Sequence, residues 1–207
     1  MPGFRDRLNA EERWDLINVV RILSAAEQAR ALGPLVSATL RVVAPDFAYM
    51  TPFSEARALK DFRGRDQVLL VFFSLPQSRE RLVQLQELYA QIRPLNVEIL
   101  GIPWHPDEVL DGAVRQLPLA FPLIHDGASE AATAYALFRR SLSPEFSAPD
   151  PPLPAHLEFL VDRQGYLRGR WIPDEGVGWG DPEQLLAAID ALRQEKLDAP
   201  PADLHVH

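Results

Sequence analysis

Residues 67–73 read Gln-Val-Leu-Leu-Val-Phe-Phe, and from 68 to 73 the run is entirely apolar. A continuous run rich in β-branched and aromatic residues is typical of a strand that is buried on both faces of a sheet. The pattern returns at 97–102, after an amphipathic helix that we predict at 77–92. Two buried strands joined by a helix form a βαβ unit, so the sequence predicts an α/β domain.

The segments around this unit continue the alternation and then change to a hairpin. We expect short strands opening at 45–47 and 121–124, helices at 106–116 and 128–140, strands at 156–161 and 166–171, and a last helix at 181–196 that begins with Asp181 and Pro182. The turn 162–165 joins the two late strands, and the proline-rich segment 143–154 is predicted to be a loop. This order predicts a mixed central sheet with helices on both faces.

A helical arm is predicted before this domain. Asn9 and Glu12 have the spacing of a capping box, and Gly33-Pro34 ends the helix that follows at 9–31. Its apolar stripe consists of Leu16, Val19, Val20, Leu23 and Ala26, with Trp14 and Ile17 beside it. Such a stripe packs either on the following domain or on another chain. We therefore divide the chain into an arm at 1–44, a domain at 45–197 and a loose tail at 198–207.

Composition excludes several classes of function. The net charge is −8, and the last 34 residues carry eight acidic and only two basic side chains. Without a basic stripe we expect no nucleic-acid surface and no binding to anionic lipid. The chain has no cysteine, which removes disulfides, thiolate chemistry, cysteine-ligated zinc and CxxCH haem attachment. The longest apolar run, 67–78, is too short for direct membrane insertion, and the N-terminus has no apolar segment typical of a signal peptide.

The stretch PDFAYMTPFSEARALKDFRGRDQVLLVFF (45–73) and the hairpin DRQGYLRGRW (162–171) resemble the thioredoxin-like superfamily. The resemblance extends over 45–197 and is strongest to the branch of Sco copper chaperones, TlpA-type oxidoreductases and peroxiredoxin-like proteins. It implies a thioredoxin-like α/β fold, with a mixed central sheet flanked by helices, and a periplasmic location.

In that superfamily the chemistry sits where the first buried strand meets the first helix. A Cys-x-x-Cys or Cys-x-x-x-Cys stands there at the helix N-terminus, whose partial positive charge lowers the thiol pKa. In this chain the place reads Ser74, Leu75, Pro76, Gln77, Ser78, and Ser78 falls where the resemblance puts a cysteine. A serine nucleophile needs an adjacent base. We therefore favour a capping box of Ser74 and Gln77, with Pro76 in the first turn, over a hydroxyl nucleophile.

Other candidate residues follow the second buried strand and precede the hairpin. Trp104 and His105 come at the carboxyl end of a strand, where ligands bind in such sheets, and we expect a packing tryptophan followed by a solvated histidine. The resemblance places the Sco copper-binding histidine on Pro154, so that no copper ligand carries over, and it also makes Pro154 equivalent to the cis-proline of the oxidoreductases. His156 and Glu158 alternate on one strand face, either as half of a metal site or, as we expect, as a surface pair on an edge strand.

The three remaining histidines indicate a functional site less strongly than the residues above. His125 and Asp126 end a short predicted strand, where a local bond from side chain to backbone is expected. His205 and His207, with Asp203, form a His-x-His tail that suits copper, nickel or zinc.

Met1-Pro2-Gly3-Phe4 and the helix NAEERWDLINVVRIL (9–23) resemble the end of a c-type cytochrome. The resemblance suggests an upstream cytochrome or membrane domain, of the kind found with CopD-like copper proteins. Haem is not expected on this chain alone, because the CxxCH is absent.

We therefore predict a non-catalytic thioredoxin-fold module that binds a protein partner in a copper- or cytochrome-linked envelope system, with no cofactor of its own. Thiol–disulfide exchange requires a thiolate, and this chain supplies none. One alternative is a copper-handling protein that uses His105, His156 or the His205/His207 tail. A third is hydrolase or transferase chemistry at Ser74 and His105.

Overall fold

The computed structural model describes residues 9–51, 55–105, 116–136, 138, 154–173, 178–196 and 200–202. Its helices are α1 (Ala10–Arg30), α2 (Arg79–Ile92), α5 (Ala128–Ala136) and α6 (Pro182–Gln194), with short 3-10 turns at Leu59–Phe62 and Arg93–Leu95. Its strands are β1 (Val42–Val43), β2 (Ala48–Tyr49), β3 (Arg57–Ala58), β4 (Gln67–Phe73), β5 (Val97–Pro103), β6 (His156–Val161) and β7 (Tyr166–Trp171). Within these residues, no helix has both the length and the apolar character needed to cross a membrane.

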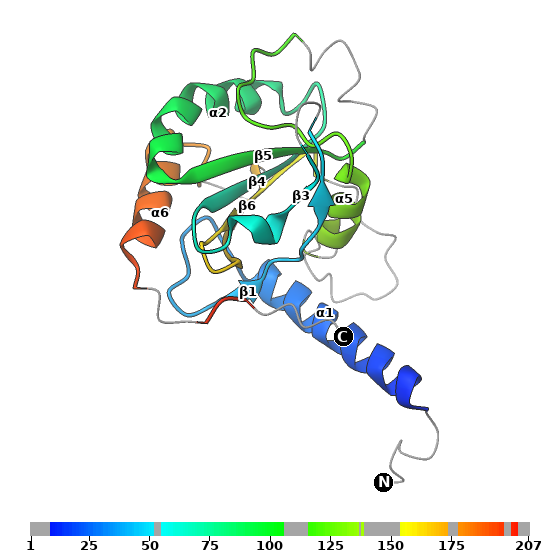
Figure 1. Cartoon of the computed structure of the whole chain (residues 1–207). Coiled ribbons are helices and arrows are strands. Elements are labelled where there is room, and N and C mark those ends of the chain that lie inside the picture. Colours follow the sequence, from blue (N-terminus) through cyan, green and yellow to red (C-terminus); the bar gives the residue numbers. More distant parts are fainter. Residues whose placement is uncertain are drawn as a thin grey trace.

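The main sheet has five strands in the order β1-β7-β6-β4-β5, and β2 and β3 form a small separate sheet (Figure 1). β4 runs parallel to β5 and antiparallel to β6, and β7 and β1 continue the sheet in antiparallel pairs. Every residue of β4 and of β5 is buried. The mixed sheet with two fully buried parallel strands is therefore confirmed.

Helices cover both faces of this sheet. On one face Leu82 and Leu85 of α2 and Ile189 of α6 pack against alternate residues of β4, among them Val71. On the other face α5 contributes Ala131 and Tyr135, which join Leu70 and Phe72 of β4. Alternation along β4 thus supplies both cores, because successive side chains of a strand point to opposite faces.

Two local signals at element ends are confirmed. Asn9 Oδ1 accepts from the Glu12 N–H at 2.8 Å while Glu12 Oε2 accepts from the Asn9 N–H at 2.8 Å, which completes the predicted capping box. Asp181 caps α6 through the Glu183 N–H, with Pro182 at the first helical position.

The hairpin turn between β6 and β7 also forms as predicted. Asp162 Oδ1 accepts from the N–H groups of Gln164 and Tyr166, each at 2.9 Å. Gly165 takes φ 90°, a left-handed conformation that favours glycine.

Several boundaries differ from prediction. The expected strand at 121–124 is reduced to an isolated bridge between Leu123 and Gly101, because Pro122 removes a donor from this short segment. The short strand expected to open at 45–47 forms one residue later, as β2. The expected helix at 106–116 lies outside the described residues except for Gln116, which is in a turn.

The arm and the tail both contribute to the domain. Ala26, Ala29 and Leu32 are buried in the core, and β1, within the predicted arm, pairs with β7. The tail is not loose at 200–202. Ala202 is buried, and its N–H donates to the Gln164 carbonyl at 2.8 Å. The Tyr166 hydroxyl donates to the Pro200 carbonyl. The remaining part of α1 extends away from the domain (Figure 1).

Candidate functional site

The loop between β4 and α2 is fastened to the residue that precedes β6. The Ser74 N–H donates to the Ala155 carbonyl at 2.8 Å, and the Ser78 N–H donates back to the Ser74 carbonyl at 3.0 Å. The Leu75–Pro76 peptide bond within this loop is cis. Neighbouring strands β4 and β6 thus bring Ser74, Ser78 and Ala155 together at one end of the sheet.

Ser78 occupies the position that the resemblance assigns to a cysteine, at the N-cap of α2. Its side chain is buried, and its hydroxyl donates to the Ala155 carbonyl at 2.8 Å. A hydroxyl held by a carbonyl has no base to take its proton, so this contact is structural. It ties α2 to β6.

The predicted capping box of Ser74 and Gln77 is wrong. α2 begins at Arg79, two residues later than predicted, and the N-cap residue Ser78 makes no side-chain bond to a helix N–H. The tight turn at 75–78 uses the Ser74 carbonyl and the Pro76 carbonyl, which accepts from the Arg79 N–H at 3.0 Å. Gln77 is exposed within that turn.

A buried ionic cluster lies beside this loop. Arg81 of α2 donates from Nε to Glu158 Oε1 at 2.7 Å and from Nη2 to Oε2 at 3.0 Å. His156 Nε2 lies 2.8 Å from the same Oε1. Glu158 is 0% exposed and Arg81 8% exposed, so both charges are removed from water.

Two opposing effects, burial and the neighbouring cluster side chains, determine the pKa of Glu158. Burial alone raises the pKa of a carboxyl group, because it penalises the charged form. Here the Arg81 guanidinium and the hydrogen bond with His156 outweigh burial, and the pKa of Glu158 lies below its ordinary value. The carboxylate is therefore held in its charged form.

The expectation that His156 and Glu158 form a surface pair on an edge strand is wrong. β6 lies between β7 and β4 in the middle of the sheet, and α2 covers the face on which the two side chains lie. Trp171 of β7 closes the cluster, with the Arg81 guanidinium 4.8 Å from its ring centroid and the His156 ring centroid at 5.8 Å. Both Glu158 oxygens are occupied, so the pair is not half of an open metal site.

Sequence reasoning missed Arg81. The available signal was its position on the face of α2 that also carries Leu82, Leu85 and Leu88, all of them buried. An arginine on the apolar face of an amphipathic helix predicts a buried acidic partner, because an unpaired buried charge is costly.

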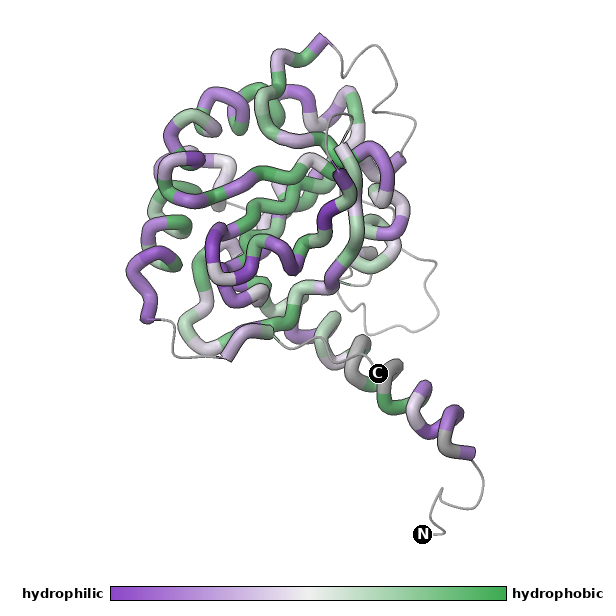
Figure 2. The backbone as a smooth tube through the Cα atoms, in the orientation of Figure 1, coloured by the Kyte–Doolittle hydropathy of each residue, from purple (hydrophilic) through white to green (hydrophobic). Residues whose placement is uncertain are grey.

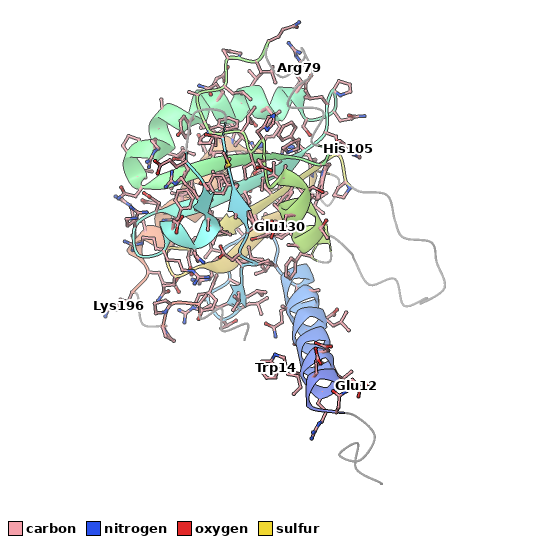
Figure 3. The ribbon with its side chains drawn as sticks, turned by 45° about the vertical axis from the view of Figure 1, so that its right-hand side comes forward. Glu12, Trp14, Arg79, His105, Glu130 and Lys196 are labelled. Carbon is pink, nitrogen blue, oxygen red and sulfur yellow. The ribbon has the colours of Figure 1, made fainter. Side chains whose placement is uncertain are left out.

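The other predicted residues near this end of the sheet separate into buried and exposed ones. Trp104 stacks on Phe72 with ring centroids 4.8 Å apart, which confirms a packing role. His105 is exposed at the end of β5, at the edge of the domain (Figure 3). Pro154 is half-buried next to Ala155, and a test of its expected cis bond requires Leu153, which lies outside the described residues.

His125 does not join this cluster. His125 and Asp126 are both exposed and pair with Met50 through main-chain bonds of 3.1 and 3.0 Å. Asp203, His205 and His207 lie outside the described residues. Among the residues that are described, no group of three or more His, Asp or Glu side chains could hold a metal ion.

Comparisons with known proteins agree with this architecture. The family described as AhpC/TSA matches residues 41–170, and no curated protein matches the chain in sequence. The solved structures that share its fold include both thiol:disulfide interchange proteins and peroxiredoxins.

Three of these structures show which kinds of protein share the fold. A Chlorobium tepidum protein assigned as the thiol:disulfide interchange protein DsbE has 18% identity and a TM-score of 0.53, over 71% of this chain and 95% of its own. The Xanthomonas campestris bacterioferritin comigratory protein, described with alkyl peroxide reduction activity, has 18% identity and a TM-score of 0.55, over 71% and 92%. BsSco, of the Sco family of cytochrome c oxidase assembly proteins, has 15% identity and a TM-score of 0.56, over 78% and 99%.

These likenesses establish a thioredoxin-like fold, as predicted. The family match begins at Arg41, after α1, so the cytochrome-like character of residues 1–23 stays a prediction. Because the match spans more than half of the sequence, from before β1 to Arg170 in β7, the chain belongs to the AhpC/TSA family, and it does so without a single cysteine.

Proposed function

We propose that this chain is a redox-inactive binding module, a thioredoxin-like domain that contacts a protein partner in a periplasmic system linked to copper or to a cytochrome. The observation that carries the proposal is the state of Ser78. It stands at the N-cap of α2, where thiol chemistry is expected, and its hydroxyl is buried against the Ala155 carbonyl. The scaffold is retained while the reacting group is replaced by a structural contact.

The binding surface is the end of the sheet where β4 and β5 finish. In open α/β sheets ligands bind beyond the carboxyl ends of the strands. Pro76, Gln77, Arg79 and His105 are exposed there. The loop that carries the first two is fixed at both Ser74 and Ser78, so a partner would meet a preorganised surface and ordering it would cost little entropy.

The link to copper or a cytochrome has two supports. One is the cytochrome-like sequence at 1–23, and the other is the fold likeness to BsSco, a member of a family of cytochrome c oxidase assembly proteins. A binding module in such a system would position another protein and would leave electron transfer to it.

Two assays test the absence of catalysis and the presence of binding. Purified chain should neither reduce insulin with dithiothreitol nor consume peroxide faster than a Ser78→Ala variant, and an activity that Ser78→Ala abolishes would overturn the proposal.

In the source organism, deletion of the coding sequence should lower cytochrome c oxidase activity. Wild type and Ser78→Ala should restore it equally, whereas the edge variant Gln77→Lys/His105→Glu should not.

A matched control separates loss of binding from loss of folding. Glu87→Lys changes the charge of an exposed residue of α2, away from the loop that carries Gln77, and should complement fully. Full complementation by the edge variant would contradict the proposed surface.

Isothermal calorimetry with Cu²⁺ addresses the alternative, because sub-micromolar binding that is lost in His205→Ala/His207→Ala would favour a copper-handling protein.

A further inference from the structure

The projecting part of α1 carries the largest group of exposed apolar side chains among the described residues. Eight large hydrophobic residues are exposed among the described residues as a whole, and five of them belong to this helix: Trp14, Leu16, Ile17, Val20 and Leu23. Figure 2 shows hydrophobic positions along α1 as well as in the central strands. Trp14 lies on the part of α1 that extends away from the domain (Figure 3).

Leu16, Val20 and Leu23 form a continuous seam on this helix. They are 50%, 58% and 54% exposed, and their spacings of four and three residues place them on one face. A seam of this spacing is the pattern by which two helices pack side by side. The buried contacts of Ala26 and Ala29 lie near the other end of the helix and leave the seam uncovered.

The seam and its flanking charges are complementary to themselves in an antiparallel arrangement. With Val20 on a two-fold axis, Val20 meets its own copy, and Leu16 lies within one residue, about 1.5 Å along the axis, of the level of Leu23 of the second copy. Arg13 and Glu27 stand seven residues before and after Val20, so each arginine faces the glutamate of the other chain. In a parallel arrangement Arg13 would face Arg13 and Glu27 would face Glu27.

The direction of α1 allows this pairing. A helix rises about 1.5 Å per residue, so Val20 lies about 15 Å from the end of α1 at Arg30. An antiparallel pair therefore places the two domains at opposite ends, about 30 Å apart along the axis. The side of the domain with Arg79 and His105 points away from the projecting helix and stays accessible (Figure 3).

We propose that α1 is a dimerisation arm that pairs antiparallel with α1 of a second copy of this chain, through Leu16, Val20 and Leu23 and two symmetric Arg13–Glu27 pairs. The inference goes beyond the proposed function and does not depend on it, because the arm and the binding edge lie on different parts of the molecule.

Single-cysteine crosslinking tests the register, since the chain has no cysteine of its own. Val20→Cys oxidised with diamide should give a disulfide-linked dimer. Leu16→Cys and Leu23→Cys should each stay monomeric alone and should crosslink only when mixed, because a disulfide needs Cα atoms within about 7 Å. Val83→Cys, an exposed apolar position on α2, is the control for random collision.

Sedimentation equilibrium of the full chain gives a second readout. Val20→Glu should abolish the dimer, and Val83→Glu should leave it intact. Arg13→Glu and Glu27→Arg should each weaken association by about fivefold, and the double variant should recover it. Self-crosslinking of Leu16→Cys and Leu23→Cys, a monomeric wild type, or no recovery in the double variant would overturn the proposal.

Discussion

Removal of Arg81 is the most informative perturbation of the buried cluster. Arg81→Leu leaves a large apolar side chain at this position of α2 but removes the cation that binds both oxygens of Glu158, which is 0% exposed. Breaking a buried ion pair by removing one partner costs about 3–5 kcal/mol. Domains of this size unfold with about 5–15 kcal/mol, so the variant should lose a large share of its stability.

The loss should depend on pH with a definite sign. In the wild type the pKa of Glu158 is lowered, so its stabilisation is present above the ordinary pKa of a glutamate and is lost as the pH falls through the lowered value. In Arg81→Leu, burial is no longer opposed by the guanidinium, and we expect the pKa of Glu158 to rise above its ordinary value. The stability difference between the two proteins should therefore shrink from pH 7 towards pH 4.

Urea unfolding followed by tryptophan fluorescence at pH 7 and pH 4.5 measures both effects. Arg81→Leu/Glu158→Leu should recover most of the loss, because replacing both charged partners leaves no unpaired charge. Arg193→Leu removes an exposed arginine that pairs with Asp190, and it should change stability by less than about 1 kcal/mol. A cost below about 1 kcal/mol for Arg81→Leu, or a double variant less stable than the single one, would refute the reasoning.

Three further measurements follow from other contacts. Ser78→Ala removes one of the two hydrogen bonds to the Ala155 carbonyl and should cost about 1 kcal/mol in urea unfolding, whereas an unchanged midpoint would show that the contact is unimportant. Gly169→Ala would place a Cβ 2.6 Å from Trp179, which is fully buried, and should cost about 1–3 kcal/mol by overpacking; a variant as stable as the wild type would contradict this. Burial raises the pKa of Tyr49 to about 12 and raises the pKa of Tyr135 as well. For Tyr89, burial and a hydrogen bond to Glu98 act together to raise the pKa. Absorbance at 295 nm should therefore show these three phenols still protonated at pH 11, whereas the stability that they contribute should already be lost progressively as the pH rises above about 10, where the phenols of the unfolded chain ionise; early ionisation of all four tyrosines would be the contrary result.

Local patterns in the sequence determined the elements whose causes are themselves local. The apolar run at 68–73 predicted a strand buried on both faces, and β4 is buried at every position. The caps at Asn9 and Asp181 form as their side chains require, within a few residues of chain. Together these signals also determined the fold class, because a βαβ unit followed by a hairpin leaves few ways to arrange a sheet.

Only the tertiary structure decided which surfaces are covered. His156 and Glu158 alternate as on any half-exposed strand, and they are buried because the strand order puts β6 in the centre and α2 brings Arg81 across it. The stripe on α1 has a single sequence pattern, yet Ala26 is buried and Val20 is exposed. Periodicity reports that a face is apolar, but what packs on that face depends on segments far away in the chain. For this reason the sequence predicted the scaffold and the missing thiol, while the ionic cluster and the uncovered arm emerged only from the packing of distant elements.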